Sequence, residues 1–163
     1  MSISEQQSSY MQVLGQVNLD NLHIQQAFEY YQQRYQDSPF AQQFVGNNCC
    51  IDNEFITELS IGYCDRTLGK NIPKAKSPEG AEIRGSLQRC GLVRPTGHEL
   101  FRGCIVIPMV DNNGSIISAV GHRVGRLRNG DKSVVYWHKP EPKAFVDVGM
   151  AFAKELMHGQ AFH

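Results

Sequence analysis

The chain has 163 residues, of which 41% are hydrophobic and 20% are charged, so it holds enough apolar material for one folded domain and is not disordered throughout. No run of about 18 apolar residues is present, and the N-terminus lacks the basic and apolar regions of a signal peptide. Together with cysteines that we expect to be reduced, these features predict a cytoplasmic protein without membrane contact.

The formal net charge is zero, but the charges are distributed unevenly along the chain. Residues 1–60 hold seven acids and one base, whereas residues 61–163 hold fifteen bases and nine acids. An asymmetry of this kind indicates contact between the basic half and a polyanion such as nucleic acid. A solvated basic surface without a ligand gives the same pattern.

The first half of the sequence is helical in pattern. Residues 1–20 are rich in Gln and Ser and are predicted to form a flexible tail. From Leu22 a helix is expected, because Ile24, Phe28, Tyr31 and Tyr35 fall on one helical face. Ser38 and Pro39 end this helix and begin a shorter one that stops at Gly46.

Two further helices are expected before residue 92. The first covers residues 53–60, and the second begins at Ser77-Pro78-Glu79 and stops at Gly91. Between them, residues 66–77 have no periodicity and are predicted to form an exposed loop carrying Lys70, Lys74 and Lys76.

The pattern then changes to strands. Residues 101–110 and 115–124 are rich in β-formers and flank a turn at residues 111–114, so they predict a hairpin. A third strand follows at residues 133–137, and residues 148–157 are helical in pattern. The predicted fold is therefore α+β: a helical N-terminal half, an antiparallel β-meander and a C-terminal helix, in one domain over residues 21–163.

No metal site, cofactor or catalytic residue is predicted. The cysteines are odd in number and form no C-x-x-C pair, so we expect reduced, partly buried thiols (Cys49, Cys50, Cys64, Cys90 and Cys104). The histidines are isolated, and no carboxylates are spaced to hold the two ions of a phosphoryl-transfer site.

The strongest functional signal is a basic segment with aromatic residues among the bases. Its cations are Arg123, Arg126, Arg128, Lys132, Lys139 and Lys143. Cations neutralise phosphates and rings stack on unpaired bases, so Tyr136 joins the candidate DNA-binding set, whereas core packing is favoured for Trp137. The alternative is a mobile surface hairpin with a core tryptophan.

Three segments of the basic half resemble bacterial replicative (DnaG-type) primases. Residues 101–114, FRGCIVIPMVDNNG, are similar to the F-R-x-R-I-x-F-P-I-x-D-x-x-G stretch of that family. Residues 118–124 resemble its G-x-x-G-G-R-V/x-L segment, and residues 136–141 resemble part of its K-Y-L-N-S-P-E-T run. In the helical half, residues 27–31, 37–39 and 61–63 resemble the A-x-x-Y-Y, S-P and I-G-Y/F elements.

The resemblance covers about residues 25–150 and implies the N-terminal subdomain of the primase catalytic core. In the family this subdomain packs against a TOPRIM subdomain that carries the metal-binding carboxylates. The 24 residues before Gln25 contain no cysteine for a zinc module, and the fourteen after Gly149 are too few for TOPRIM. We therefore expect this chain to lack both modules.

The resemblance also suggests individual site residues. Arg123 aligns with an arginine that lines the family's groove, and Arg102 from the F-R motif joins the candidates. Two groove lysines of the family fall on Val135 and on Val146-Asp147, and a groove arginine is replaced by Glu58. These departures favour a binding role over independent catalysis.

The sequence thus predicts a primase-related replication protein that binds single-stranded DNA or primer–template. A separate TOPRIM, primase, helicase or polymerase protein is the expected partner, in a plasmid, phage or other mobile element. Two alternatives stay open: a degenerate module for protein interaction, and a fragment of a complete primase.

Overall fold

The computed structural model describes residues 3–47, 60–74, 76–125, 127, 129–130 and 132–140. Two compact units divide the chain, and His23–Lys139 form the larger one. Everything described below belongs to this unit, except the part of the first helix that precedes His23.

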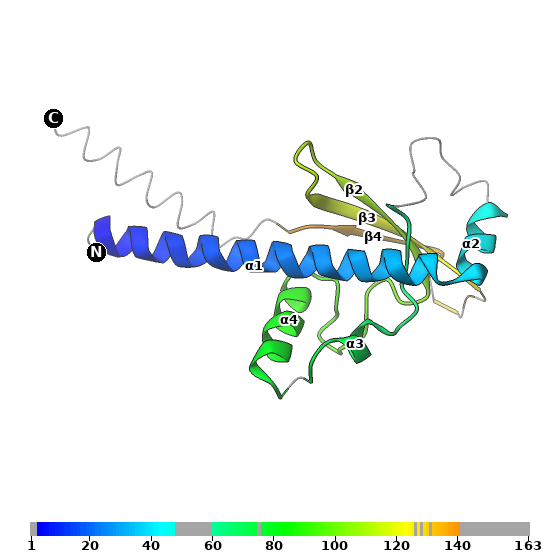
Figure 1. Cartoon of the computed structure of the whole chain (residues 1–163), viewed down its shortest axis with the longest axis horizontal. Coiled ribbons are helices and arrows are strands. Elements are labelled where there is room, and N and C mark those ends of the chain that lie inside the picture. The colour runs from blue at the N-terminus through cyan, green and yellow to red at the C-terminus, as the bar shows by residue number, and fades with distance from the viewer. Residues whose placement is uncertain are drawn as a thin grey trace. The chain divides into compact units, whose positions relative to one another are not determined.

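Helix α1, Ile3–Gln36, supplies one side of the core (Figure 1). Its residues Ile24, Phe28, Tyr31 and Tyr35 are all buried, as their spacing predicted. The helix begins at Ile3, well before the predicted start at Leu22, because the polar residues before that point contain no proline or other helix-breaking signal. The flexibility of residues 1–20 stays a prediction.

Two later helices begin at the predicted Ser-Pro pairs. In α2, Pro39–Gly46, the Ser38 hydroxyl caps the helix by accepting a hydrogen bond from the Ala41 N–H at 3.1 Å. In α4, Pro78–Arg89, the Ser77 hydroxyl accepts from the Gly80 N–H at 3.0 Å. Proline fits the first turn of both helices because its missing N–H would have no partner there.

The strands form one antiparallel sheet in the order β1-β2-β3-β4. The strands are β1, Gly62–Tyr63; β2, Cys104–Val110; β3, Ile116–Arg123; and β4, Val134–His138. Asp111 closes the β2–β3 turn, because its carboxylate accepts hydrogen bonds from the N–H groups of Asn113 and Ser115, each at 2.9 Å. The α+β fold and the meander are therefore confirmed.

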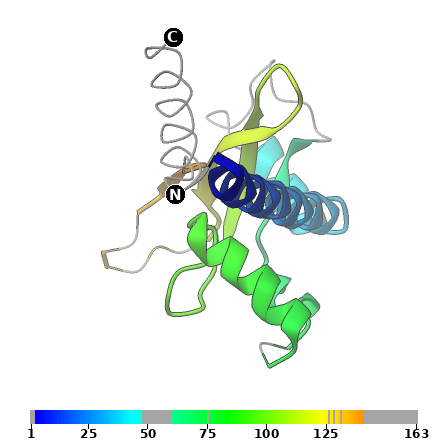
Figure 2. The same cartoon turned by 90° about the vertical axis from the view of Figure 1, so that its left-hand side faces the viewer.

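Each face of the sheet has its own hydrophobic cluster. One face carries Cys104, Val106, Ala119 and Trp137, which pack with the buried residues of α1 and α4. The other face carries Ile105 and Ile107, which pack with Tyr35, Ala41 and Ile61. In Figure 1, α4 lies below α1 and the strands lie mostly above it, and Figure 2 also shows α4 below α1.

Two glycines allow the sheet to approach its neighbours closely. A Cβ on Gly62 would lie 2.7 Å from Tyr31 Cβ, and one on Gly121 would lie 2.5 Å from the Phe101 ring. Both distances are shorter than any ordinary contact, so only glycine fits. The Gly62 contact sets β1 against α1, and the Gly121 contact sets the turn before β2 against β3.

The segment predicted as a plain loop contains the short helix α3, Leu68–Asn71, after the two-residue strand β1. The predicted helices at residues 53–60 and 148–157 lie outside the described residues. Trp137 is a core residue, as predicted: its side chain is 6% exposed, and its indole N–H donates to the Cys90 carbonyl at 2.7 Å. Cys64, Cys90 and Cys104 are buried free thiols, also as predicted.

Candidate nucleic-acid interface

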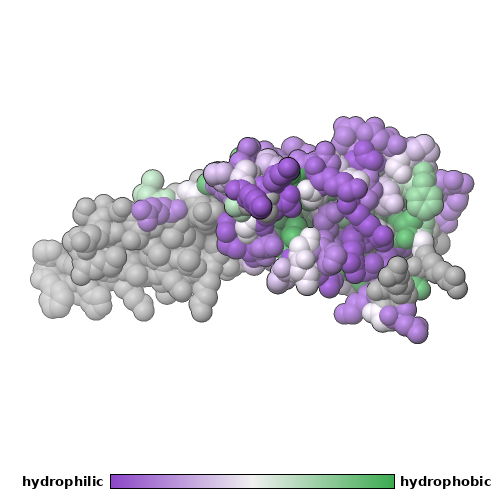
Figure 3. All heavy atoms as spheres, turned by 90° about the horizontal axis from the view of Figure 1, so that it is seen from below, coloured by the Kyte–Doolittle hydropathy of each residue, from purple (hydrophilic) through white to green (hydrophobic). Residues whose placement is uncertain are grey.

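A cavity of about 540 Å³ opens where α3, α4, the segment between α4 and β2, and the end of β3 meet. Its lining includes five cationic side chains, Arg66, Lys70, Arg84, Arg102 and Arg123, and one carboxylate, Glu99. Figure 3, which looks onto the side of α3 and α4, shows a mostly hydrophilic surface. A concentration of positive charge in a concave site attracts anions and raises their local concentration.

Arg123 is the last residue of β3 and lies on the sheet face that packs against the helices, opposite Cys104 in register. Its Nε donates to the Lys132 carbonyl at 3.1 Å, and its backbone N–H donates to the Ser133 carbonyl at 2.9 Å. The carbonyls of Lys132 and Ser133 therefore hold Arg123 in place at the cavity that it lines.

Arg102 lies in the turn that precedes β2. Phe101 is fully buried and packs over Gly121, which leaves the next residue at the surface. Gly103 has a φ of +71°, and its N–H donates to the Cys64 carbonyl at 2.8 Å. The buried ring and this backbone bond together direct the exposed Arg102 to the cavity.

Arg66 has a left-handed backbone, with a φ of +70°. It is the single described non-glycine residue with a positive φ, and such a conformation costs about 1–3 kcal/mol. Its Nη2 would lie 3.1 Å from a Cβ on Gly103, so a larger residue there would press against the guanidinium. The conformation places Arg66 beside the Arg102 turn.

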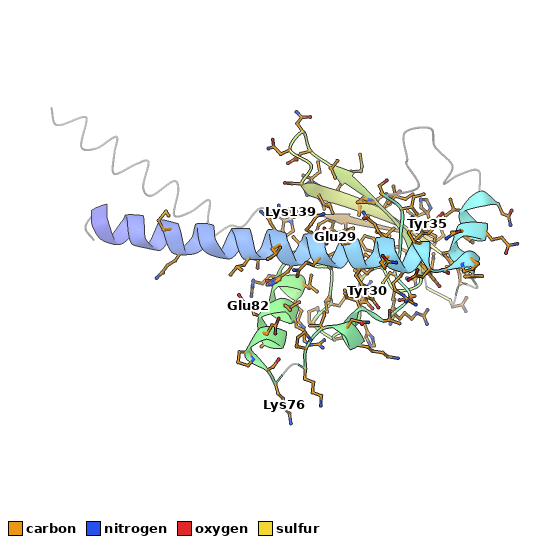
Figure 4. All side chains as sticks on the ribbon, viewed as in Figure 1. Glu29, Tyr30, Tyr35, Lys76, Glu82 and Lys139 are labelled. Carbon is orange, nitrogen blue, oxygen red and sulfur yellow. The ribbon has the colours of Figure 1, made fainter. Side chains whose placement is uncertain are left out.

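A polar network from α1 holds the segment that follows β1. The Asp65 carboxylate pairs with Arg34 Nε at 2.5 Å and accepts from the N–H and hydroxyl of Thr67. The Tyr30 hydroxyl bonds to the Thr67 hydroxyl and accepts from Asn71 Nδ2 at 2.7 Å. Figure 4 shows Tyr30 on the side of α1 that faces α3. These contacts fix the residues on both sides of Arg66.

Arg84 of α4 holds another wall of the cavity in place. Its Nη2 donates to the carbonyls of Gly69, Ile72 and Pro73 at 3.0, 3.4 and 3.2 Å. These bonds satisfy carbonyls at the end of α3, which is too short to satisfy its own. Arg84 therefore acts on the shape of the cavity as well as on its charge.

The carboxylate of the cavity is turned toward buried groups. Glu99 Oε1 accepts from Cys64 Sγ at 3.3 Å and from the Tyr31 hydroxyl at 3.4 Å. Burial raises the pKa of Glu99, and burial likewise raises the pKa of Cys64 and of Tyr31. Burial also raises the pKa of Cys104 to about 11, while the nearby charges of Arg123 and Arg66 act in the opposite direction.

The sequence-predicted residues do not all lie on one surface. Tyr136 pairs with Val120, and Val135 pairs with Gly121. Because side chains alternate along a strand, Arg123 lies on the same sheet face as Gly121 and Val135, and Tyr136 lies on the opposite face. Tyr136 is 78% exposed there. Val135, where the resemblance places a lysine, is half-buried and packs against the core on the face of Arg123.

Arg102 and Arg123 are the predicted residues that the structure brings together at the cavity. Lys132 contributes its carbonyl to Arg123, and Lys139 follows β4, where its N–H donates to the Ile117 carbonyl at 2.9 Å. Arg126, Arg128 and Lys143 lie outside the described residues. Sequence reasoning missed the contributions of Arg66 and Arg84, although it did recognise the segment from residue 66 as basic.

Within the described ranges, no group of three or more His, Cys, Asp or Glu residues could hold a metal ion. No described helix combines the length and apolar character that crossing a bilayer requires. The absence of catalysis by this chain stays a prediction.

No protein-family model matches the chain, and no curated protein matches it in sequence. Solved primase structures do share its fold. The DnaG primase catalytic domain bound to ssDNA is 22% identical with a TM-score of 0.57, and the match covers 81% of this chain and 42% of that one. This fold is that of part of the DnaG primase catalytic core.

Two further primase structures agree. The DnaG catalytic core is 23% identical with a TM-score of 0.56, and the match covers 77% of this chain and 39% of that one. The zinc-binding and RNA polymerase domains of the Aquifex aeolicus primase are 16% identical with a TM-score of 0.54, covering 80% and 31%. The chain thus spans less than half of the length of each of these solved chains, and the resemblance is confirmed at the level of the fold.

Proposed function

We propose that this chain is a primase-related DNA-replication protein that binds single-stranded DNA or primer–template through the basic cavity. The observation that carries the proposal is the position of the cavity: Arg102 and Arg123, the two residues matched to family motifs, line it together. One of the DnaG primases with this fold is bound to ssDNA. A cytoplasmic location and a TOPRIM, primase, helicase or polymerase partner belong to the same proposal.

The charge balance of the cavity supports an anionic ligand. In the described part of the chain, no ion pair joins Arg66, Arg102 or Arg123 to an acid. Cations close together without counter-charges repel each other, and DNA phosphates remove this repulsion while releasing counterions. The contact is expected to favour single strands, because a backbone held in a basic groove leaves the bases free to unstack.

The test is fluorescence anisotropy of a labelled oligonucleotide with wild type, Arg123→Ala, Arg123→Lys and Arg94→Ala. Arg123→Ala is expected to weaken binding several-fold, because it removes a phosphate contact, and Arg123→Lys is expected to keep most of the affinity. Arg94 is exposed and does not line the cavity, so it is the matched control. Wild-type affinity in Arg123→Ala would remove this residue from the interface.

Protein docking is the second candidate function, and one observation favours it. Met109 and Tyr136 are 60% and 78% exposed on the same sheet face, in neighbouring rows of the ladder. Exposed apolar side chains that gather on one face are typical of interaction sites. Size-exclusion chromatography with a TOPRIM-bearing primase fragment tests this role: Tyr136→Ala is expected to reduce co-elution, and co-elution unchanged by the substitution would argue against it.

A further inference from the structure

Asp65 is an acid that precedes a cation of the cavity without lining the cavity itself. Its side chain is 15% exposed, and both carboxylate oxygens have partners: Oδ2 pairs with Arg34 Nε at 2.5 Å, and Oδ1 accepts from the Thr67 N–H at 3.2 Å. A negative charge beside a site for anions ordinarily weakens their binding, because like charges repel. The contacts of Asp65 give it the opposite effect.

The hydrogen bond from the Thr67 N–H to Asp65 closes a ring of atoms that contains Arg66. A carboxylate that accepts from the N–H two residues later forms an Asx-turn, which restricts the backbone of the residue between them. That residue is Arg66, and its φ is +70°. Such a conformation persists in an arginine only where the surroundings impose it. The Asx-turn therefore holds Arg66 in its left-handed conformation.

Helix α1 holds this turn at both of its ends. Arg34 pairs with the Asp65 carboxylate, and the Tyr30 hydroxyl bonds to the Thr67 hydroxyl, which also donates to Asp65. Tyr30 and Arg34 are four positions apart, so they lie on the same face of α1. The two residues that flank Arg66 are thus fixed to one helix face, and the contacts that fix them lie outside the cavity lining.

The left-handed backbone determines where the Arg66 guanidinium lies. A Cβ on Gly103 would lie 3.1 Å from Arg66 Nη2, and Arg66 lines the cavity together with Arg102 and Arg123. With the negative φ that is ordinary for arginine, the side chain would leave the backbone in a different direction, because φ sets the direction of the Cα–Cβ bond relative to the preceding peptide. The presence of this cation in the cavity therefore depends on a turn outside it.

We propose that Asp65 is a positioning residue, which Arg34 and Tyr30 help to fix and which keeps Arg66 in the cavity. An acid then strengthens the binding of an anion that it does not touch. The proposal rests on the proposed DNA-binding function, from which it takes the anion, and adds to that function a residue that is neither a cation nor part of the cavity lining.

The sign of the effect of Asp65 is tested by fluorescence anisotropy with a labelled single-stranded oligonucleotide. Asp65→Ala is expected to weaken binding about fivefold, because the contact between Arg66 and a phosphate is largely lost. Asp65→Asn keeps an oxygen that can accept from the Thr67 N–H, so it is expected to bind within about twofold of wild type. Repulsion alone predicts tighter binding in both variants.

The control for the loss of an acid is Asp37→Ala. Asp37 is exposed at the end of α1, does not line the cavity, and accepts hydrogen bonds from Gln33 of its own helix. Its substitution removes the same charge as Asp65→Ala and leaves the turn around Arg66 intact. It is expected to bind the oligonucleotide at least as tightly as wild type does.

A double-mutant cycle distinguishes positioning from a general effect on the fold. Arg66→Gly removes the cation, and glycine adopts a φ of +70° without strain, so the turn is retained. Asp65→Ala is expected to cause no further loss of affinity in the Arg66→Gly background, because Asp65 acts only through Arg66. A merely structural role would give the same loss in both backgrounds.

Nuclear magnetic resonance tests the turn without DNA. When φ is positive, the amide hydrogen and the Hα of the same residue lie close together, so their nuclear Overhauser effect is strong. For Arg66 we expect a strong effect in wild type and in Asp65→Asn, and a weak one in Asp65→Ala. Circular dichroism confirms that each variant folds.

Any of three results would overturn the positioning role: undiminished binding in Asp65→Ala, an equal loss in the Arg66→Gly background, or a strong effect retained at Arg66 in Asp65→Ala. In these cases the proposed DNA-binding function stands if wild type binds the oligonucleotide. If wild type does not bind it, that function fails, and the spectrum of Asp65→Ala still decides whether Asp65 positions Arg66.

Discussion

Two kinds of residue shape the cavity: the cations that line it, and the glycines that leave room for those cations to lie close together. Gly121 lies under the Phe101 ring, and Gly103 lies beside the Arg66 guanidinium. Because Phe101 immediately precedes Arg102, the packing of a buried ring controls where an exposed cation lies. The chemistry of the cavity therefore depends on glycine contacts in the core as well as on charge.

Gly121→Ala is expected to destabilise the fold by about 1–3 kcal/mol, because a methyl group 2.5 Å from the Phe101 ring forces the ring or the strand to move. Urea unfolding followed by circular dichroism measures the change. Gly46→Ala is the matched control, since nothing lies within 4 Å of its added Cβ, and it is expected to be neutral or slightly stabilising. Equal stability of the two variants would mean that the Phe101–Gly121 contact does not constrain the turn.

The residue scale also shows what the sequence could predict about the site. Arg123 and Arg102 were predicted because they occur in recognisable motifs, and both line the cavity. Arg66 carried no comparable signal, because its conformation depends on Arg34, which contacts Asp65 from 31 positions earlier in the chain. The separation of Tyr136 from Arg123 depends on strand register, which the sequence pattern left open.

Among the elements, β2, β3, α2 and α4 were predictable because local signals mark their ends. The Asp111 turn, the Ser38 cap and the Ser77 cap each use the hydrogen bonds that such residues are known to make. By contrast, β1 has two residues and α3 has four, too few to show a periodicity. Both are stabilised by packing and hydrogen bonds to α1 and β2, not by local propensity.

Glu99, in the segment between α4 and β2, contacts Tyr31 of α1 and Cys64 next to β1, and its burial there makes stability depend on pH. Burial raises the pKa of Glu99 in the folded state above its ordinary value of 4.5. As pH rises through 4.5, the unfolded chain loses this proton first, so the free energy of unfolding falls until the folded-state pKa is passed and then stays lower. Below pH 4.5 this group carries no penalty.

Glu99→Gln removes the titrating group while keeping an oxygen that can accept from Tyr31 and Cys64. The difference in urea midpoint between the variant and wild type is expected to be larger at pH 7 than at pH 4, in favour of the variant. The same substitution is expected to strengthen anion binding, since it removes the negative charge from the cavity lining. A midpoint difference that is the same at both pH values would contradict the burial effect.

For the whole molecule, the net charge of zero is the sum of an acidic first part and a basic second part of the chain. The acidic first sixty residues include helices that form one side of the core, and the basic remainder supplies all five cations of the cavity. The overall fold was predictable because helical and strand periodicities occur in separate stretches of the sequence. The cavity itself was not, because its walls come from the segment after β1, from α4, from the segment between α4 and β2, and from the end of β3.

Catalysis is tested at this scale as well. The chain alone is expected to make no primer when given template, ribonucleotides and Mg²⁺ or Mn²⁺, because no predicted carboxylate set holds the two ions. Incorporation of a radiolabelled nucleotide, resolved on a denaturing gel, is the measurement, with a complete DnaG primase as the positive control. Product from the chain alone would contradict the binding-only account.

The central claim is that the cavity cations bind nucleic-acid phosphates, and the salt dependence of wild-type binding tests it most directly. Anisotropy of a labelled single-stranded oligonucleotide is measured over a series of salt concentrations. If Arg66, Arg102 and Arg123 each neutralise a phosphate, the logarithm of the association constant should fall with the logarithm of salt concentration with a slope of about −2. Absence of binding at the lowest salt concentration, or binding that does not weaken as salt is added, would contradict it.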